Sequence, residues 1–218
     1  MANAKLIDIT NDAENQMVYC ARVSNPSNQS NFHTGGRLLK YCLDHRHWSV
    51  FEMAYATVEV ETERDISAQI LRNRSFCFQE FSTRYAKTSK AEPFEIRRQD
   101  NKNRQSSHND LPEDVQSDYT GRVQGIIDDA WTLYEEMITN GIARETARRI
   151  LPMCTPTTFY MSGNVRSWIH YIEVRTQPGT QKEHRDVAIA IRNALAPKLP
   201  IIADVLGWET EAQVTHFE

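Results

Sequence analysis

One alternating segment most strongly limits how this chain can fold. Residues 55–62 alternate apolar and polar side chains and are rich in β-branched residues, which indicates a strand with one buried face. Residues 155–162, rich in threonine and aromatic side chains, also predict a strand. Between them, apolar residues recur at helical spacing from Leu111 to about Asn140. This combination of strands and long helices predicts the α+β class.

The rest of the chain adds weaker elements and places most helices in the second half. Short strands are expected at residues 5–10 and 93–98, and residues 99–109, almost without apolar side chains, are expected to form a mobile loop. Further helices are expected at residues 13–23, 37–45, 64–74, 143–151, 165–175 and 181 to about 206, the last broken near Pro197 and Pro200. We therefore expect residues 1–218 to form a single α+β domain with a helix-rich second half.

Composition and charge argue against nucleic-acid and membrane partners. The net charge of −4 disfavours polyanions, and no apolar run approaches the roughly 20 residues that span a bilayer. The four cysteines are scattered without C-x-x-C spacing and indicate reduced thiols in a cytoplasmic protein. Arginine outnumbers lysine by 18 to 7, which favours bidentate recognition of small anions.

The segment 69–85 concentrates side chains that can bind an anion. Arg72, Arg74 and Arg84 fall within thirteen residues, and apolar residues interrupt them, so the segment is not a simple solvated charge run. The arginine side chain presents a rigid fork of donors that suits phosphate and carboxylate. On the residues alone, a structural arginine–glutamate network at a helix end explains the cluster equally well.

The order of these residues resembles the signature of flavin-dependent thymidylate synthases. Arg72-Asn73-Arg74, seven residues and then Ser82 resemble that family's Arg-His-Arg, seven residues, Ser, and the continuation Ser82-Thr83-Arg84-Tyr85 matches its Ser-x-Arg-Tyr. Weaker matches lie on both sides of this signature in the family's order, at Phe51-Glu52, Gln69, Ala147-Arg148 with Leu151-Pro152, Asn164-x-Arg166-Ser167 and Arg175. The resemblance extends from Ala21 to the C-terminal helix.

The resemblance implies a fold and a reaction. Family members have a central, mostly antiparallel sheet and bind FAD at the subunit interfaces of a homotetramer. They use NADPH to reduce the flavin, take a one-carbon unit from methylenetetrahydrofolate and transfer it to C5 of dUMP, which gives dTMP without a cysteine nucleophile. The flavin supplies the hydride chemistry, and the protein orients it.

Site residues carry over by position. The resemblance implies that dUMP is bound by Gln69, Glu80, Ser82, Arg84, Arg148 and Arg175. It implies that the flavin is bound by Ser24, Arg72, Asn73, Arg74, Asn164, Arg166 and His170. Arg175 is the expected catalytic residue, because its charge favours the negative charge that builds on the uracil ring. No metal is expected, since His45 and His47 lack a third ligand at a convincing spacing.

Three departures from the family pattern leave alternatives open. Asn73 replaces the signature histidine, Met53 stands where the family has the histidine of Phe-Glu-His, and His170 occupies a position often filled by asparagine. One alternative is a related flavin- and folate-dependent methyl- or hydroxymethyltransferase that acts on another pyrimidine deoxynucleotide, such as dCMP. A second is a non-catalytic homologue that binds a nucleotide or RNA, although the negative net charge argues against RNA. Cys154 is interpreted as a packing residue, since it lacks the surroundings of a catalytic thiol.

Overall fold

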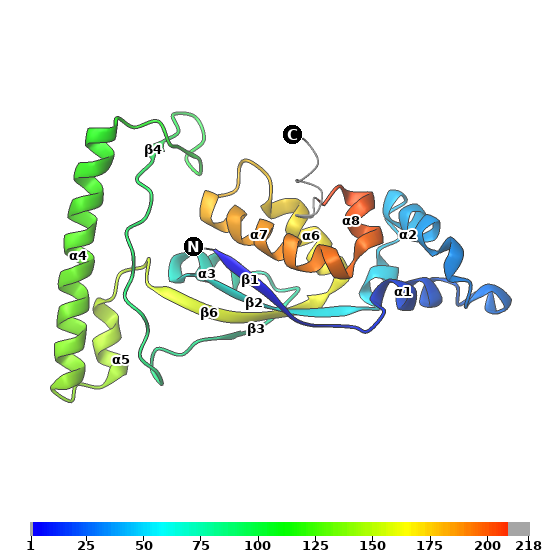
Figure 1. Ribbon diagram of the computed structural model, residues 1–218, viewed down its shortest axis with the longest axis horizontal. Coiled ribbons are helices and arrows are strands. Elements are labelled where there is room, and N and C mark those ends of the chain that lie inside the picture. Colours follow the sequence, from blue (N-terminus) through cyan, green and yellow to red (C-terminus); the bar gives the residue numbers. More distant parts are fainter. Residues whose placement is uncertain (1, 209–218) are drawn as a thin grey trace.

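The computed structural model describes residues 2–208, with a four-stranded antiparallel sheet at the centre (Figure 1). Its strands lie in the order β1-β2-β6-β3. They are β1 (Asn3–Ile9), β2 (Tyr55–Glu63), β3 (Cys77–Glu80) and β6 (Pro156–Asn164). β2 and β6 pair along their whole lengths, from Tyr55 opposite Asn164 to Glu63 opposite Pro156. The α+β class and the antiparallel sheet expected from the sequence are therefore confirmed.

Helices cover one face of this sheet and stand at both of its ends. In Figure 1, α6 and α7 lie across the face, α1 and α2 lie at one end, and α4 and α5 stand at the other. The helices are α1 (Ala13–Ala21), α2 (Gly35–Asp44), α3 (Arg64–Ile70), α4 (Glu113–Thr139), α5 (Arg144–Ala147), α6 (Val165–Arg175), α7 (Lys182–Leu195) and α8 (Pro200–Leu206). The expected break near Pro197 and Pro200 is confirmed, because a short 3-10 turn separates α7 from α8. Within the described residues, none of the helices combines the length and the apolar character that a membrane crossing requires.

One strand was missed, and two local expectations were wrong. β3 was not foreseen: its four residues are too few for a clear alternation, and pairing with the edge of β6 decides their conformation. α3 ends at Ile70 rather than at residue 74, because both the backbone and the side-chain amide of Asn73 donate to the Ile70 carbonyl. The strand expected at 93–98 shrinks to β4 (Arg98–Gln99), which pairs with β5 (Ser107–His108) inside the segment expected to be a loop.

The core is closed by a tryptophan on α6. Trp168 is fully buried, and its indole N–H donates to the carbonyls of Ala56 on β2, at 3.2 Å, and Gly163 on β6, at 3.1 Å. The ring of Phe76 packs edge-on against it at 4.6 Å between centroids. A Cβ on Gly163 would lie only 2.5 Å from that phenyl ring, so β6 carries a glycine where the ring crosses it. This packing fixes the start of α6 against the sheet.

We expect Gly163→Ala to lower the free energy of unfolding by about 1–3 kcal/mol, because Phe76 is wedged against Trp168 and has little room to retreat. Gly121→Ala on α4 is the control: its methyl group would meet no atom within 4 Å, and alanine favours a helix by roughly 0.5–1 kcal/mol. Urea unfolding of both variants checks this. A Gly163→Ala protein as stable as the wild type would contradict the packing argument.

Candidate functional site

Nine of the thirteen expected site residues line one of three separate cavities. The first, of about 470 Å³, lies at the start of α6. It is lined by Trp48, Glu52, Ser75, Asn164, Arg166, Ser167 and His170. The Asn164 side chain caps the helix by accepting from the backbone N–H of Ser167 at 2.9 Å, and Arg166 pairs with Glu52. The cavity thus offers cationic and amide groups beside a helix N-terminus, where anions are favoured.

The second cavity, of about 770 Å³, lies between α3, the end of α6 and the start of α7. Among its lining residues are Gln69, Arg72 and Asn73, from the segment that resembles the family signature, and Arg175 at the end of α6. The amide of Gln69 donates to the side-chain oxygen of Gln181 at 2.8 Å. The structure therefore brings together two residues expected at the flavin and two expected at the nucleotide.

A buried histidine forms the floor of this second cavity. His184 is only 1% exposed, and its ring nitrogens lie 3.1 Å from the Tyr171 hydroxyl and 3.4 Å from the side-chain oxygen of Gln69. Burial, with the nearby positive charge of Arg175, lowers the pKa of His184 to about 4. Burial also raises the pKa of Tyr171 far above its ordinary value. Both groups are therefore neutral near pH 7, and the positive charge here comes from the arginines.

The third cavity, of about 490 Å³, lies between the loop after β3 and the start of α5. Ser82, Arg84 and Tyr85 face Arg144 and Glu145 across it. Arg84 is largely exposed and reaches Glu145 at 3.2 Å, a solvent-accessible pair that contributes little to stability. The guanidinium of Arg84 is therefore available to a stronger anion.

Two further expected residues bond inside the protein. Glu80 on β3 accepts hydrogen bonds from the hydroxyls of Ser67, at 2.7 Å, and Thr157, at 3.1 Å. Arg148 donates to the Thr83 hydroxyl at 3.1 Å. Both side chains are half-buried and oriented by these bonds. Ser24 and Arg74 are exposed, Ser24 in the segment that follows α1.

Several cavity residues were missed by the sequence reasoning. They are Trp48, Glu52, Ser75 and Ser167 in the first cavity, Arg104, Gln105, Gln181 and His184 in the second, and Arg144 and Glu145 in the third. Glu52 and Ser167 belong to motifs that match the family pattern, so this membership could have identified them as candidate site residues. His184 gave none, because a single histidine on an amphipathic helix has the same pattern as a core residue.

A fourth cavity, of about 440 Å³, lies beside Cys154 and includes Glu63, Asp65 and Glu183. Burial raises the pKa of the Cys154 thiol, and the carboxylates of Asp65 and Glu63 raise it further. The thiol is therefore protonated at neutral pH and poorly suited to act as a nucleophile. Nowhere in residues 2–208 do three His, Cys, Asp or Glu side chains gather as metal ligands.

The comparisons with known proteins show the family to which the chain belongs. Residues 5–201 match the family described as "Thymidylate synthase complementing protein", so the chain belongs to that family. The chain is 49% identical over 214 residues to the "Probable flavin-dependent thymidylate synthase" of Paramecium bursaria Chlorella virus 1, which covers 94% of this chain and 99% of that protein. It is 46% identical over 195 residues to the flavin-dependent thymidylate synthase of Synechocystis sp., covering 89% and 90%.

A solved structure shares the fold. The UMP/dUMP methylase PolB from Streptomyces cacaoi, solved with bound 5-Br dUMP, superposes with a TM-score of 0.82 over 95% of both chains, at 24% sequence identity. The resemblance to flavin-dependent thymidylate synthases, inferred from the segment 69–85 and the motifs on both sides of it, is therefore confirmed.

We expect protonation of His184 to oppose folding in acid. Its pKa is about 4 in the folded chain and near 6.5 when unfolded, so its stabilising effect is complete above pH 6.5 and is lost as the pH falls towards 4. Relative to His184→Gln, the wild type should lose on the order of 1 kcal/mol of unfolding free energy per pH unit across this range. Denaturant unfolding at several pH values measures it, with the exposed His33→Gln as control. Parallel curves for wild type and His184→Gln would contradict the prediction.

Proposed function

We propose that this chain is a flavin-dependent thymidylate synthase, which methylates C5 of dUMP to give dTMP. FAD is the cofactor, NADPH the reductant and methylenetetrahydrofolate the one-carbon donor. Family membership over residues 5–201 and the names of the relatives support this function. The observation that carries it is the second cavity, where Gln69, Arg72 and Asn73 of the signature segment lie beside Arg175.

The side chains present fit a flavin dinucleotide. Arg72 lines the second cavity without forming an ion pair to any described carboxylate, so its guanidinium is available to a phosphate. Asn164, Arg166 and His170 offer amide, guanidinium and imidazole groups at the start of α6. When bound, the flavin supplies hydride transfer. The role of these residues is to bind its phosphates and orient the ring.

Arg175 has the position expected of the group that stabilises charge on the substrate. Its side chain is half-buried at the end of α6, beside the neutral pair His184 and Tyr171. A partly desolvated guanidinium acts strongly on negative charge that develops nearby. Gln69 is held by Gln181, so its amide is oriented to bind the imide edge of a pyrimidine. Cys154 takes no part, because its thiol stays protonated.

One copy of the chain does not gather the whole substrate set. Gln69 and Arg175 line the second cavity, whereas Ser82 and Arg84 line the third. Copies of the chain, arranged so that the third cavity of one faces the second cavity of another, would complete the site. The number of four subunits comes from the family resemblance, and the split of the residues supports sites shared between them. In this arrangement, Ser82 and Arg84 of one copy bind the phosphate of a nucleotide that lies in the second cavity of a neighbouring copy.

The chain is further proposed to be a single cytoplasmic domain. The same apolar core includes Ala13 near one end and Trp208 near the other. All four cysteines are free, as in a reducing compartment. The relatives' names favour dUMP over dCMP as substrate, and they favour a catalytic chain over a non-catalytic nucleotide-binding homologue.

The visible absorption spectrum of the purified protein tests this function directly. We expect a yellow protein whose flavin is bleached by NADPH, and formation of dTMP when methylenetetrahydrofolate and dUMP are added. The same assay with dCMP is the control for substrate class, and it should give no methylated product. A colourless protein that ignores added FAD would contradict the proposal.

Arg175→Ala should lower the rate of dTMP formation by about 100- to 1000-fold, the usual effect of removing one preorganised charge-stabilising donor. Arg122→Ala is the matched control, because Arg122 is an exposed residue of α4 whose only ion pair among the described residues is with Asp118, one helical turn away. Single-turnover product formation measures the rate, and circular dichroism checks the fold. Near-normal turnover in Arg175→Ala would refute the proposed role.

A further inference from the structure

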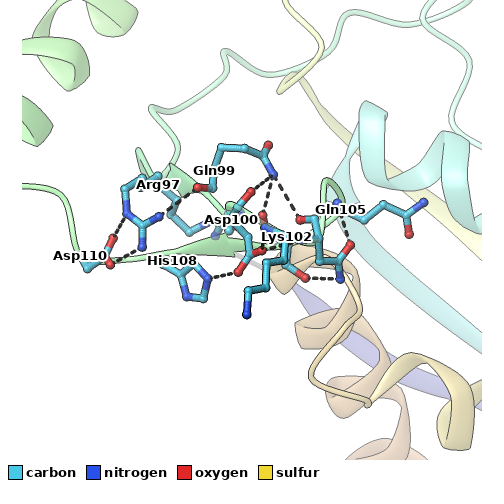
Figure 2. A network of polar contacts seen from close by, with 11 residues as sticks. Arg97, Gln99, Asp100, Lys102, Gln105, His108 and Asp110 are labelled. Carbon is cyan, nitrogen blue, oxygen red and sulfur yellow. Dashed lines mark hydrogen bonds and ion pairs between the residues drawn. The ribbon is translucent and has the colours of Figure 1, made fainter.

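The hairpin of β4 and β5 brings two residues into the second cavity that lie outside every matched motif. Arg104 and Gln105, in the turn between the strands, line it together with Gln69, Arg72 and Arg175. Figure 2 shows this hairpin from close by, with the Gln105 side chain directed away from the polar network of the turn. Three distant parts of the sequence therefore share one cavity.

Asp100 holds the turn in one conformation. One carboxylate oxygen accepts the backbone N–H groups of Lys102, at 2.7 Å, and Asn103, at 2.6 Å, and the other lies 2.5 Å from the His108 ring (Figure 2). The bond with His108, followed by the two N–H groups, lowers the pKa of Asp100 to about 2. The Asn103 side chain in turn accepts the N–H of Gln105 at 3.0 Å. Polar bonds thus order a segment that has almost no apolar side chains.

The base of the hairpin is tied to the opposite wall of the cavity. Arg97, whose side chain is only 12% exposed, pairs with Glu95 at 3.0 Å and with Glu183 on α7 at 2.5 Å. Arg98 makes a bidentate pair with Asp110, at 2.9 and 2.6 Å, just beyond β5. Because α7 forms that wall, the ion pairs fix where Arg104 and Gln105 stand relative to it.

The charge of the cavity is unbalanced. Arg72, Arg104 and Arg175 line it, and its described lining includes no aspartate or glutamate. None of these guanidiniums forms an ion pair within residues 2–208, whereas Arg97 and Arg98 are paired. The start of α7 adds the positive end of a helix dipole. In a chain of net charge −4, such a concentration of positive charge favours an anionic ligand.

We infer that Arg104 is a further phosphate-binding residue of this cavity and that Asp100 is its positioning residue. The inference rests on the proposed function, whose ligands dUMP, FAD and NADPH all carry phosphate. Residues expected to bind the nucleotide and the flavin line this cavity, so the monophosphate of dUMP and the diphosphate of FAD are the partners proposed for Arg104. A guanidinium fork binds two phosphate oxygens at once, and the Gln105 amide adds a neutral donor beside it. The turn that Asp100 orders sets the direction of that fork.

Charge-removing and charge-keeping variants of the full-length protein test the inference. We expect Arg104→Gln to weaken binding of the phosphate ligand by about 10- to 100-fold, the usual effect of losing a hydrogen bond to a charged group. Arg104→Lys should retain most of the affinity, because it keeps the charge. Lys102→Gln is the control: it removes the same charge from the same turn at a residue that does not line the cavity.

Ligands with and without phosphate identify the source. If Arg104 contacts the nucleotide, Arg104→Gln lowers the affinity for dUMP but leaves the affinity for deoxyuridine unchanged. If Arg104 contacts the cofactor, the variant lowers the affinity for FAD but leaves the affinity for riboflavin unchanged. Flavin absorbance and fluorescence report both titrations in the same assay. Either result supports phosphate binding by Arg104.

A double-mutant cycle tests the positioning role of Asp100. Asp100→Ala should lower the affinity for the same ligand as Arg104→Gln does. The double variant should bind that ligand no more weakly than Arg104→Gln alone, because both changes remove the same contact. Additive losses would overturn the role of Asp100.

Two results would overturn the role of Arg104. One is equal affinity in Arg104→Gln and Lys102→Gln, and the other is an equal loss for ligands with and without phosphate. If the wild type makes dTMP while these variants behave alike, the inference alone fails. If Arg104→Gln weakens dUMP or FAD but the wild type makes no dTMP, the proposed function alone fails. A wild type that binds neither dUMP nor FAD overturns both.

Discussion

The antiparallel pairing of β2 with β6 is the contact on which the rest of the structure depends. It joins segments about a hundred residues apart and leaves a different functional element at each end. At one end, Asn164 leaves the sheet and caps α6, which carries Arg166, His170 and finally Arg175. At the other end, the Thr157 hydroxyl of β6 donates to the Glu80 carboxylate of the neighbouring strand β3. Trp168 bonds to carbonyls of both strands, so this register is fixed by the core as well as by the ladder.

The cavities follow from this arrangement. The first forms where α6 leaves the sheet, and the second forms where α6 ends and α7 begins. The third lies farther along the chain that continues from β3, against α5. Because the helix and the strand lead away from the sheet in different places, one copy of the chain presents its candidate residues at separate cavities.

The arginines around the second cavity fall into two groups, those held in ion pairs and those that line the cavity unpaired within residues 2–208. Arg97 and Arg98 are held by two carboxylates and one carboxylate, respectively, and these pairs fix the hairpin. Arg72, Arg104 and Arg175 face the cavity without an ion pair in the described part of the chain. The buried His184 stays neutral beneath them, so the field of the cavity does not depend on a group that titrates near pH 7.

By itself, the sequence determined the α+β class, the two long strands, most helices and the segment 69–85 with its arginines. These features follow from local periodicity or from a motif of fixed spacing. Both can be recognised in the sequence without knowing which segments pack together. Only the tertiary structure decided that Cys77–Glu80 is a strand, since the free edge of β6 imposes it. It also decided that Arg104 and His184 line the same cavity as Arg175, because cavity walls are built by residues that have no spacing in common.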